Sequence, residues 1–173
     1  MKAWISIACP DMTGLIAEIA GCLFDLGANL GTTSFAVLGA AAEFTSVCEL
    51  GPGVTPEMAS LRLAALPHLR GAEIMVRPFT LDPERGPLGQ VTHEITVSGG
   101  DRPGLIARLC EAFAGFGANV VRLNSEAVAG PGGDSYIARF AVSIPKASVS
   151  ACLATISNTA EGLGLICRVE RAP

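Results

Sequence analysis

An internal repeat constrains the fold of this chain more than any other feature of its sequence. The stretch at 5–30 returns at 95–120 in the same order: an apolar run, a turn with aspartate and glycine, an amphipathic run, and Gly-Ala-Asn. Three residues mark each copy, each 90 positions from its counterpart: Asp11 and Asp101, Gly14 and Gly104, Asn29 and Asn119. Because this match is long and has no gap, we interpret the chain as two copies of one structural unit.

Hydrophobic periodicity predicts the order β-α-β-β-α-β in both copies. In the first copy we expect strands at 3–9, 29–37, 44–50 and 72–79, and helices at 15–26 and 55–66. In the second we expect strands at 91–98, 119–128, 136–144 and 165–170, and helices at 105–116 and 147–161. This order is typical of the split βαβ arrangement, so each copy is expected to be an α+β unit, a four-stranded antiparallel sheet with two helices on one face.

Residues that favour turns and caps divide these elements. Asp11 is placed to cap the helix that follows it, and Thr55 before Pro56 predicts a second helix start with Thr55 as N-cap. The stretch 38–43 is predicted to be a hairpin turn, and 129–134, which is rich in glycine, a loop.

Proline and glycine interrupt the pattern at 81–90, which predicts a linker between a first domain at 1–80 and a second at 91–173. Hydrophobic residues make up 50% of the chain and charged residues 16%, so disorder is excluded. Two small units with so few charges are expected to bury apolar surface against a neighbour. We therefore expect the units to pack on each other and the chain to form a homodimer.

The overall charge excludes some classes of function. A net charge of -4 and a pI near 5.1 argue against direct nucleic-acid binding, which needs a basic face to neutralise phosphates. No segment is long and apolar enough to cross a membrane, and the first residues lack the apolar core of a secretory signal. We expect a cytoplasmic protein that binds no membrane.

The cysteine and histidine patterns predict no metal, cofactor or catalytic site. The six cysteines form no Cys-x-x-Cys pair and have no histidine at metal-ligand spacing, so we expect small buried thiols without disulfides. His68 and His93 are far apart in the pattern, and we expect exposed or structural roles for both. No nucleophile can be placed beside a base, and the run 99–104 lacks the Lys-Ser/Thr of a phosphate loop.

With the turn, the helix and the Gly-Ala-Asn run in place, the chain resembles a tandem pair of ACT domains. These are small-molecule sensing modules of amino-acid metabolism with a ferredoxin-like fold. In the second copy the motif Asp101–Leu105 and the run Gly117–Val120 carry this resemblance. In the first copy, Asp11–Leu15 keeps the aspartate and glycine but lacks the arginine and proline. Within this family, the chain is most similar to the glycine cleavage system transcriptional repressor group. Two features carry this similarity: the chain has two copies and almost nothing else, and Leu38-Gly39 is closely followed by Glu43-Phe44-Thr45.

The resemblance implies an amino-acid site where two domains meet, built from the turn before the first helix and the start of the second strand. Carried over to this sequence, its ligand-binding residues are Asp11, Thr13, Gly14, Leu15, Asn29, Asp101, Pro103, Gly104, Leu105 and Asn119. A helix N-terminus suits the ligand carboxylate, and the aspartates could face its ammonium. Structural alternatives stay open: helix capping for the aspartates, a left-handed turn conformation for the asparagines, and turn geometry alone for the glycines.

The resemblance also implies a function. By this resemblance we expect a non-enzymatic regulatory protein that senses an amino acid such as glycine and controls transcription by binding a protein partner such as a LysR-type transcription factor. One alternative is an allosteric subunit of a metabolic enzyme, such as a formyltetrahydrofolate deformylase. Another is a small ferredoxin-like enzyme for acyl-phosphate hydrolysis or an isomerisation. Because the first copy lacks Arg and Pro, a chain in which only the site near Asp101 and Asn119 still binds is a further alternative.

Overall fold

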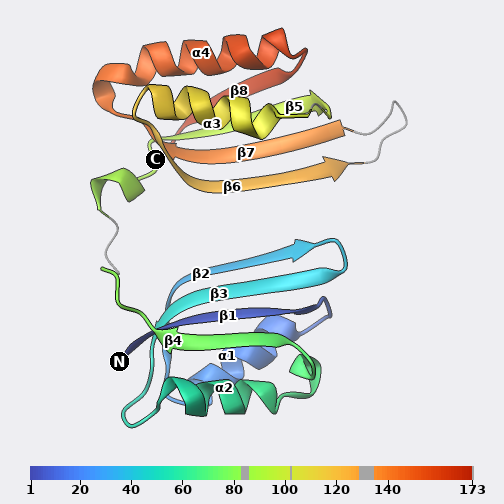
Figure 1. Cartoon of the computed structure of the whole chain (residues 1–173), viewed down its shortest axis with the longest axis vertical. Helices are drawn as coiled ribbons and strands as arrows, with labels where there is room; N and C mark the ends of the chain where they lie inside the picture. Colours follow the sequence, from blue (N-terminus) through green and yellow to red (C-terminus); the bar gives the residue numbers. More distant parts are fainter. Residues whose placement is uncertain (83–85, 102, 129–134, 173) are drawn as a thin grey trace. The chain divides into compact units, whose positions relative to one another are not determined.

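The computed structural model describes residues 1–82, 86–101, 103–128 and 135–172 (Figure 1). The chain divides into two compact units, Met1–Pro83 and Glu84–Pro173. Arg102 of the second aspartate motif, the predicted loop 129–134 and residues 83–85 of the predicted linker lie outside the described residues.

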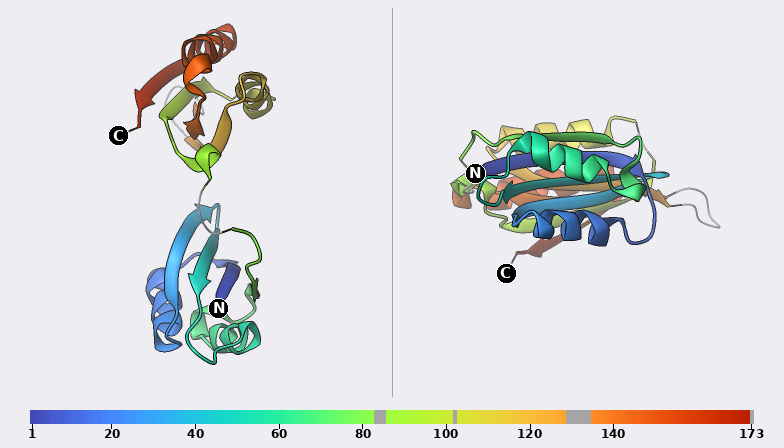
Figure 2. Two further views of the ribbon diagram at one scale, coloured as in Figure 1. Left: turned by 90° about the vertical axis from the view of Figure 1, so that its left-hand side faces the viewer. Right: turned by 90° about the horizontal axis from the view of Figure 1, so that it is seen from below.

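The first unit has the predicted β-α-β-β-α-β order. Its elements are β1 (Lys2–Pro10), α1 (Leu15–Asp25), β2 (Asn29–Leu38), β3 (Ala41–Glu49), α2 (Pro56–Ala64), the 3-10 turn η1 (Pro67–Leu69) and β4 (Glu73–Pro78). The strands form one antiparallel sheet in the order β2-β3-β1-β4. Both helices lie on one face of this sheet (Figure 2).

The second unit repeats this arrangement. It begins with a 3-10 turn, η2 (Pro87–Gly89), and continues with β5 (His93–Gly100), α3 (Leu105–Gly115), β6 (Asn119–Val128), β7 (Ser135–Ser143), the 3-10 turn η3 (Lys146–Ser148), α4 (Val149–Gly162) and β8 (Ile166–Arg171). Its antiparallel sheet has the order β6-β7-β5-β8. The prediction of two α+β units of the split βαβ type is therefore confirmed.

Alternating strands and amphipathic helices form a separate core in each unit. In the first, β1 buries every second side chain from Ala3 to Cys9, and α1 adds Leu15, Ile19 and Leu23. In the second, the tilted rings of Phe113 and Phe140 pack with centroids 5.4 Å apart. Each large side chain buried in this way contributes roughly 1.5–3 kcal/mol to folding.

The hairpin between β2 and β3 corrects one prediction. We expected a turn over 38–43, but Ala41 and Ala42 pair with Leu38 and Val37 as part of the sheet. Gly39, with φ of 64°, allows a tight turn of two residues, so both strands continue to its edge. Ala41 and Ala42 therefore belong to β3.

Candidate functional site

The predicted site residues of the second unit lie at the turn between β5 and α3. Gly104 is the N-cap of α3 with φ of 80°, a left-handed conformation that favours glycine. A methyl group built on it would meet no atom within 4 Å, so this backbone conformation, and not a lack of space, requires the glycine. The turn borders an open hollow of about 230 Å³, lined by Asp101, Pro103, Gly104, Leu105, Ile106, Ala107 and Tyr136.

The first unit has the same turn between β1 and α1. Gly14 caps α1 with φ of 89° and also has free space beside it. The backbone N–H of Asp11 donates to the carbonyl of Ala40 at 3.0 Å, which ties the turn to the β2–β3 hairpin. The side chains of Asp11 and Thr13 are exposed.

Helix capping by the aspartates is the one expectation for these turns that is wrong. Asp11 does not cap α1 and Asp101 does not cap α3, because a left-handed glycine occupies each N-cap position, and among the described residues no side chain caps either helix start. The side chains of Leu15 and Leu105 are 2% and 3% exposed, since both belong to the cores. Their side chains are therefore closed to a ligand, and the N–H of Leu15 already donates to the carbonyl of Met12 at 3.4 Å.

The arrangement around Gly104 suits a small zwitterion. The first N–H groups of a helix lack partners within the helix, and the dipole makes this end positive, which favours an anion. The α3 helix has no acidic residue in its first turn to compete for that position. The exposed carboxylate of Asp101 lines the same hollow and can meet a positive group.

Asn29 and Asn119 lie away from these turns. Asn119 is the first residue of β6, just beyond the C-terminal end of α3, whereas Gly104 precedes the N-terminal end. An 11-residue helix is about 16 Å long, so the turn and the asparagine of one unit do not meet at a common point. Neither asparagine has a positive φ, which removes the left-handed alternative; Gly27 and Gly117 take that conformation after the helices.

The surroundings of the two asparagines differ. Asn29 borders an open hollow of about 230 Å³ at an irregularity of β2, with Lys2, Gly31, Thr32, Val47, Cys48 and Glu49 as the other lining residues. Within the described residues its side chain has no hydrogen-bond partner. The side-chain amide of Asn119 instead donates to the backbone carbonyl of Leu88 in η2, at 2.7 Å. One copy is therefore open at this position, and the other is occupied by the chain itself.

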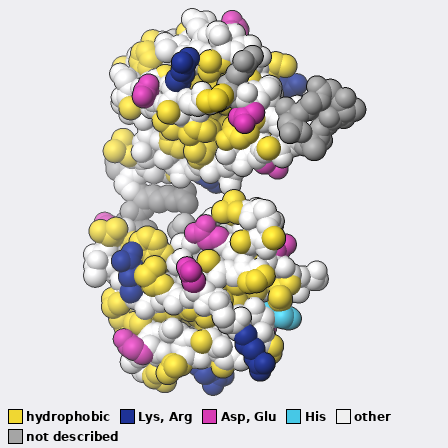
Figure 3. All heavy atoms as spheres, turned by 45° about the vertical axis from the view of Figure 1, so that its right-hand side comes forward, with side chains coloured by type: hydrophobic (Ala, Val, Ile, Leu, Met, Phe, Trp, Pro, Cys, Tyr) yellow, Lys and Arg dark blue, Asp and Glu magenta, His cyan; other side chains and the backbone are white. Residues whose placement is uncertain are grey.

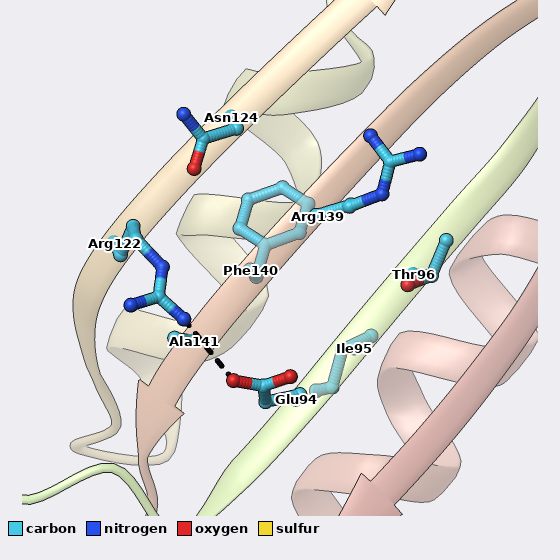
Figure 4. Close-up of a pocket in the computed structure, with 8 residues that line it drawn as sticks. All are labelled: Glu94, Ile95, Thr96, Arg122, Asn124, Arg139, Phe140 and Ala141. Carbon is cyan, nitrogen blue, oxygen red and sulfur yellow. Dashed lines mark hydrogen bonds and ion pairs between the residues drawn. The ribbon is translucent and has the colours of Figure 1, made fainter. Parts of the chain in front are cut away.

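A further hollow, of about 110 Å³, lies on the sheet of the second unit (Figure 4). Arg122 of β6 reaches across Ala141 of β7 to Glu94 of β5, with 3.1 Å between Nη2 and Oε1. Asn124 and Thr96 lie on either side of Arg139 along the same face. Sequence reasoning did not predict this cluster, although a charged residue between core residues in each strand, Glu94 in β5 and Arg139 in β7, was its signal.

Charges in this cluster are already paired. Arg139 Nη1 lies 2.6 Å from Glu126 Oε1, and Arg122 and Glu94 are 62% and 54% exposed. Ion pairs this exposed contribute on the order of 0–1 kcal/mol each. We therefore interpret the cluster as a solvated polar face of the sheet.

The thiols and histidines take structural roles. Four thiols are buried and two, Cys110 and Cys167, are half-buried, and all six are free. Burial raises the pKa of five of these thiols, which is the opposite of what a reactive nucleophile needs: Cys9, Cys22, Cys48, Cys152 and Cys167. His68 pairs with Glu18, and His93 Nδ1 lies 3.0 Å from Thr92 Oγ1.

The part of the chain that the structure describes has no metal-binding cluster. There, no three histidine, cysteine, aspartate or glutamate side chains gather so that they could hold a metal ion. None of the helices described is both long enough and apolar enough to cross a membrane. On the face shown in Figure 3, the described lysine and arginine side chains stand apart from one another and form no continuous basic patch.

Comparison with known proteins identifies the second unit. The family model described as ACT domain matches residues 94–170, from Glu94 in β5 to Glu170 in β8. Most of the second unit therefore matches the ACT domain family. No curated protein sequence matches the chain.

Solved structures extend the ACT fold to the whole chain. An unknown protein from Galdieria sulphuraria has a TM-score of 0.77 and 21% identity, and the match covers 99% of this chain and 98% of that one. A candidate glycine cleavage system transcriptional repressor has a TM-score of 0.64 and 15% identity, with 99% and 96% covered. The chain is therefore a tandem arrangement of two ACT-like units. ACT domains are typically regulatory modules rather than catalytic ones.

Proposed function

We propose that this protein is a non-enzymatic sensor of an amino acid, and that it controls the transcription of amino-acid metabolism through a protein partner. The observation that carries this proposal is the hollow beside Gly104. There a helix N-terminus and the carboxylate of Asp101 lie at one turn of an ACT domain. A ligand that has both a carboxylate and an ammonium matches both groups, because each meets the opposite charge.

In this proposal the asparagine positions are a second place on each unit where an amino acid can bind, apart from the turn. A side-chain amide donates and accepts at once, so Asn29 and Asn119 suit either end of a zwitterion. Beside Asn29, Lys2 and Glu49 line the same hollow and add one charge of each sign. Glycine is our first candidate ligand, because one structural neighbour is a candidate glycine cleavage system repressor.

A protein partner fits the charge of the chain better than DNA does. The net charge is -4, and direct binding to DNA depends on basic residues that neutralise phosphates. We propose a LysR-type transcription factor as that partner. A metabolic enzyme is the alternative, and a pull-down with the purified protein as bait separates the two by the identity of the captured protein.

The ligand proposal is tested by thermal unfolding of the full chain with each common amino acid at millimolar concentration. A ligand at one hundred times its Kd stabilises the folded state by roughly 2.7 kcal/mol, which is easily measured. Asp101→Asn should reduce the shift, because it removes the charge that meets the ammonium. Glu111→Gln, on an exposed position of α3, is the matched control. If no amino acid raises the melting temperature, the sensor proposal fails.

A further inference from the structure

We propose that the Leu88 carbonyl is an internal occupant of the Asn119 position, and that an amino-acid ligand reaches Asn119 only by displacing it. This inference rests on the proposed function and adds a means of regulation to it. The contact is the 2.7 Å hydrogen bond from Asn119 Nδ2 to the carbonyl oxygen of Leu88. No local sequence pattern requires it, because the two residues are 31 positions apart.

The η2 turn presents this carbonyl. The N–H of Gly89 donates to the carbonyl of Gly86 at 2.8 Å and closes the turn. The side chain of Leu88 is 63% exposed, so packing of the leucine does not hold the segment on β6. The bond to Asn119 is then one attachment of the turn to β6, and its loss is expected to loosen residues 86–90.

The first unit shows the same position without an occupant. Asn29 corresponds to Asn119 in the repeat, begins β2 as Asn119 begins β6, and borders an open hollow. Among the described residues, no backbone carbonyl accepts a hydrogen bond from the Asn29 side chain. The two copies of one site therefore differ in this contact, and Asn29 is a matched control for Asn119.

The chemistry of the contact indicates which part of a ligand competes. Leu88 contributes a carbonyl oxygen, so its replacement must also accept a hydrogen bond from Asn119 Nδ2. A carboxylate oxygen is the stronger acceptor, because hydrogen bonds to a charged group contribute more than those between neutral groups. The ligand carboxylate can therefore take the place of the carbonyl.

Displacement couples ligand binding to the linker. The segment 86–90 belongs to the predicted linker and lies at the start of the second unit, and a ligand on Asn119 would free it. The tethered carbonyl also weakens apparent binding, because a site is available only in the fraction of molecules in which it is open. If the ligand must first break the one neutral hydrogen bond between Asn119 and Leu88, its apparent affinity for Asn119 falls about fivefold.

The contact itself is tested without ligand by amide exchange of the full chain, read at Gly89. Asn119→Ala should speed exchange of the Gly89 N–H, because the turn loses its attachment. Asn29→Ala should leave that exchange rate unchanged. Equal protection of Gly89 in the wild type and in Asn119→Ala overturns the inference.

Competition is tested by titrating the labelled full chain with glycine, then with the other common amino acids, and following the Asn119 side-chain amide and Gly89 by NMR. Both signals should shift together. Gly89→Pro removes the N–H that closes η2 and disfavours the helical conformation of Leu88, so it should tighten binding at Asn119 about fivefold. If a ligand shifts the Asn119 signal while the Gly89 signal stays unchanged, the inference fails but the sensor proposal stands. The same holds if Gly89→Pro binds the ligand with unchanged affinity. If no amino acid shifts any residue, the sensor proposal fails as well.

Discussion

At the scale of single residues, two glycines determine the shape of the proposed site. Gly14 and Gly104 have φ of 89° and 80° and begin α1 and α3. Because their surroundings leave room for a methyl group, the cost of a side chain is the backbone conformation alone. The proposed site uses the first N–H groups of the α3 helix that Gly104 begins, so this one torsion angle bears on the stability of the helix start and on the proposal.

Gly104→Ala should therefore lower the free energy of unfolding by about 1–2 kcal/mol, the usual cost of a left-handed alanine. Urea unfolding of the two proteins measures this. Gly115→Ala, at the end of the same helix and without a positive φ, should be neutral or stabilising by up to about 1 kcal/mol. If the two variants are equally stable, the conformation of Gly104 is not the constraint we describe.

His93 predicts a pH dependence. Burial, with a smaller contribution from Arg171, lowers the pKa of His93 below its ordinary value. The unfolded chain then binds more protons than the folded one near pH 6, so the contribution of His93 to stability is complete above the ordinary histidine pKa and is lost as the pH falls through it. His93→Gln should reduce the stability difference between pH 7.5 and pH 5.5 in urea unfolding. An unchanged difference would mean that other groups cause it.

At the scale of elements, the helix starts show what local sequence determines. Thr55 caps α2 as predicted, and its Oγ1 accepts from the N–H of Met58 at 3.3 Å. The aspartate before α1 has the residue type of a cap, but Gly14 takes the left-handed conformation at the N-cap position and the helix starts at Leu15, four residues beyond Asp11. The residue type of a cap therefore predicts a helix start where that residue itself has an extended backbone directly before the helix, as Thr55 has.

Thr55→Ala should destabilise the first unit by about 1 kcal/mol, because one helix N–H loses its partner. Thr55→Ser keeps the hydroxyl and should recover most of this loss. Urea unfolding measures both variants. If the Thr55 hydroxyl stabilises α2, the serine variant is clearly more stable than the alanine variant. Equal stability of the two variants would contradict this role.

At the scale of the whole molecule, the repeat predicted two similar units, and the fold confirmed this. The differences between the units were not predictable. The contact of Leu88 with Asn119 joins a linker carbonyl to a strand 31 residues later, and no periodicity encodes such a pair. The polar cluster of Arg122 and Glu94 likewise depends on register between strands, which residue type alone does not determine.

The charge of the molecule predicts that it does not bind DNA by itself. With a net charge of -4 there is little counterion release to drive binding to phosphates. Fluorescence anisotropy of a labelled duplex at low salt should therefore stay flat as the protein is added. Saturable binding that weakens steeply with salt would contradict the proposal of a protein partner.

The central claim is that an amino acid binds this chain, and calorimetric titration of the full-length protein tests it most directly. The amino acid that gives the largest thermal shift is titrated into the wild type and into Asp101→Asn, with Glu111→Gln as the control. We predict saturable binding in the wild type and the control, and clearly weaker binding in Asp101→Asn. Absence of binding for every common amino acid at millimolar concentration would contradict the claim.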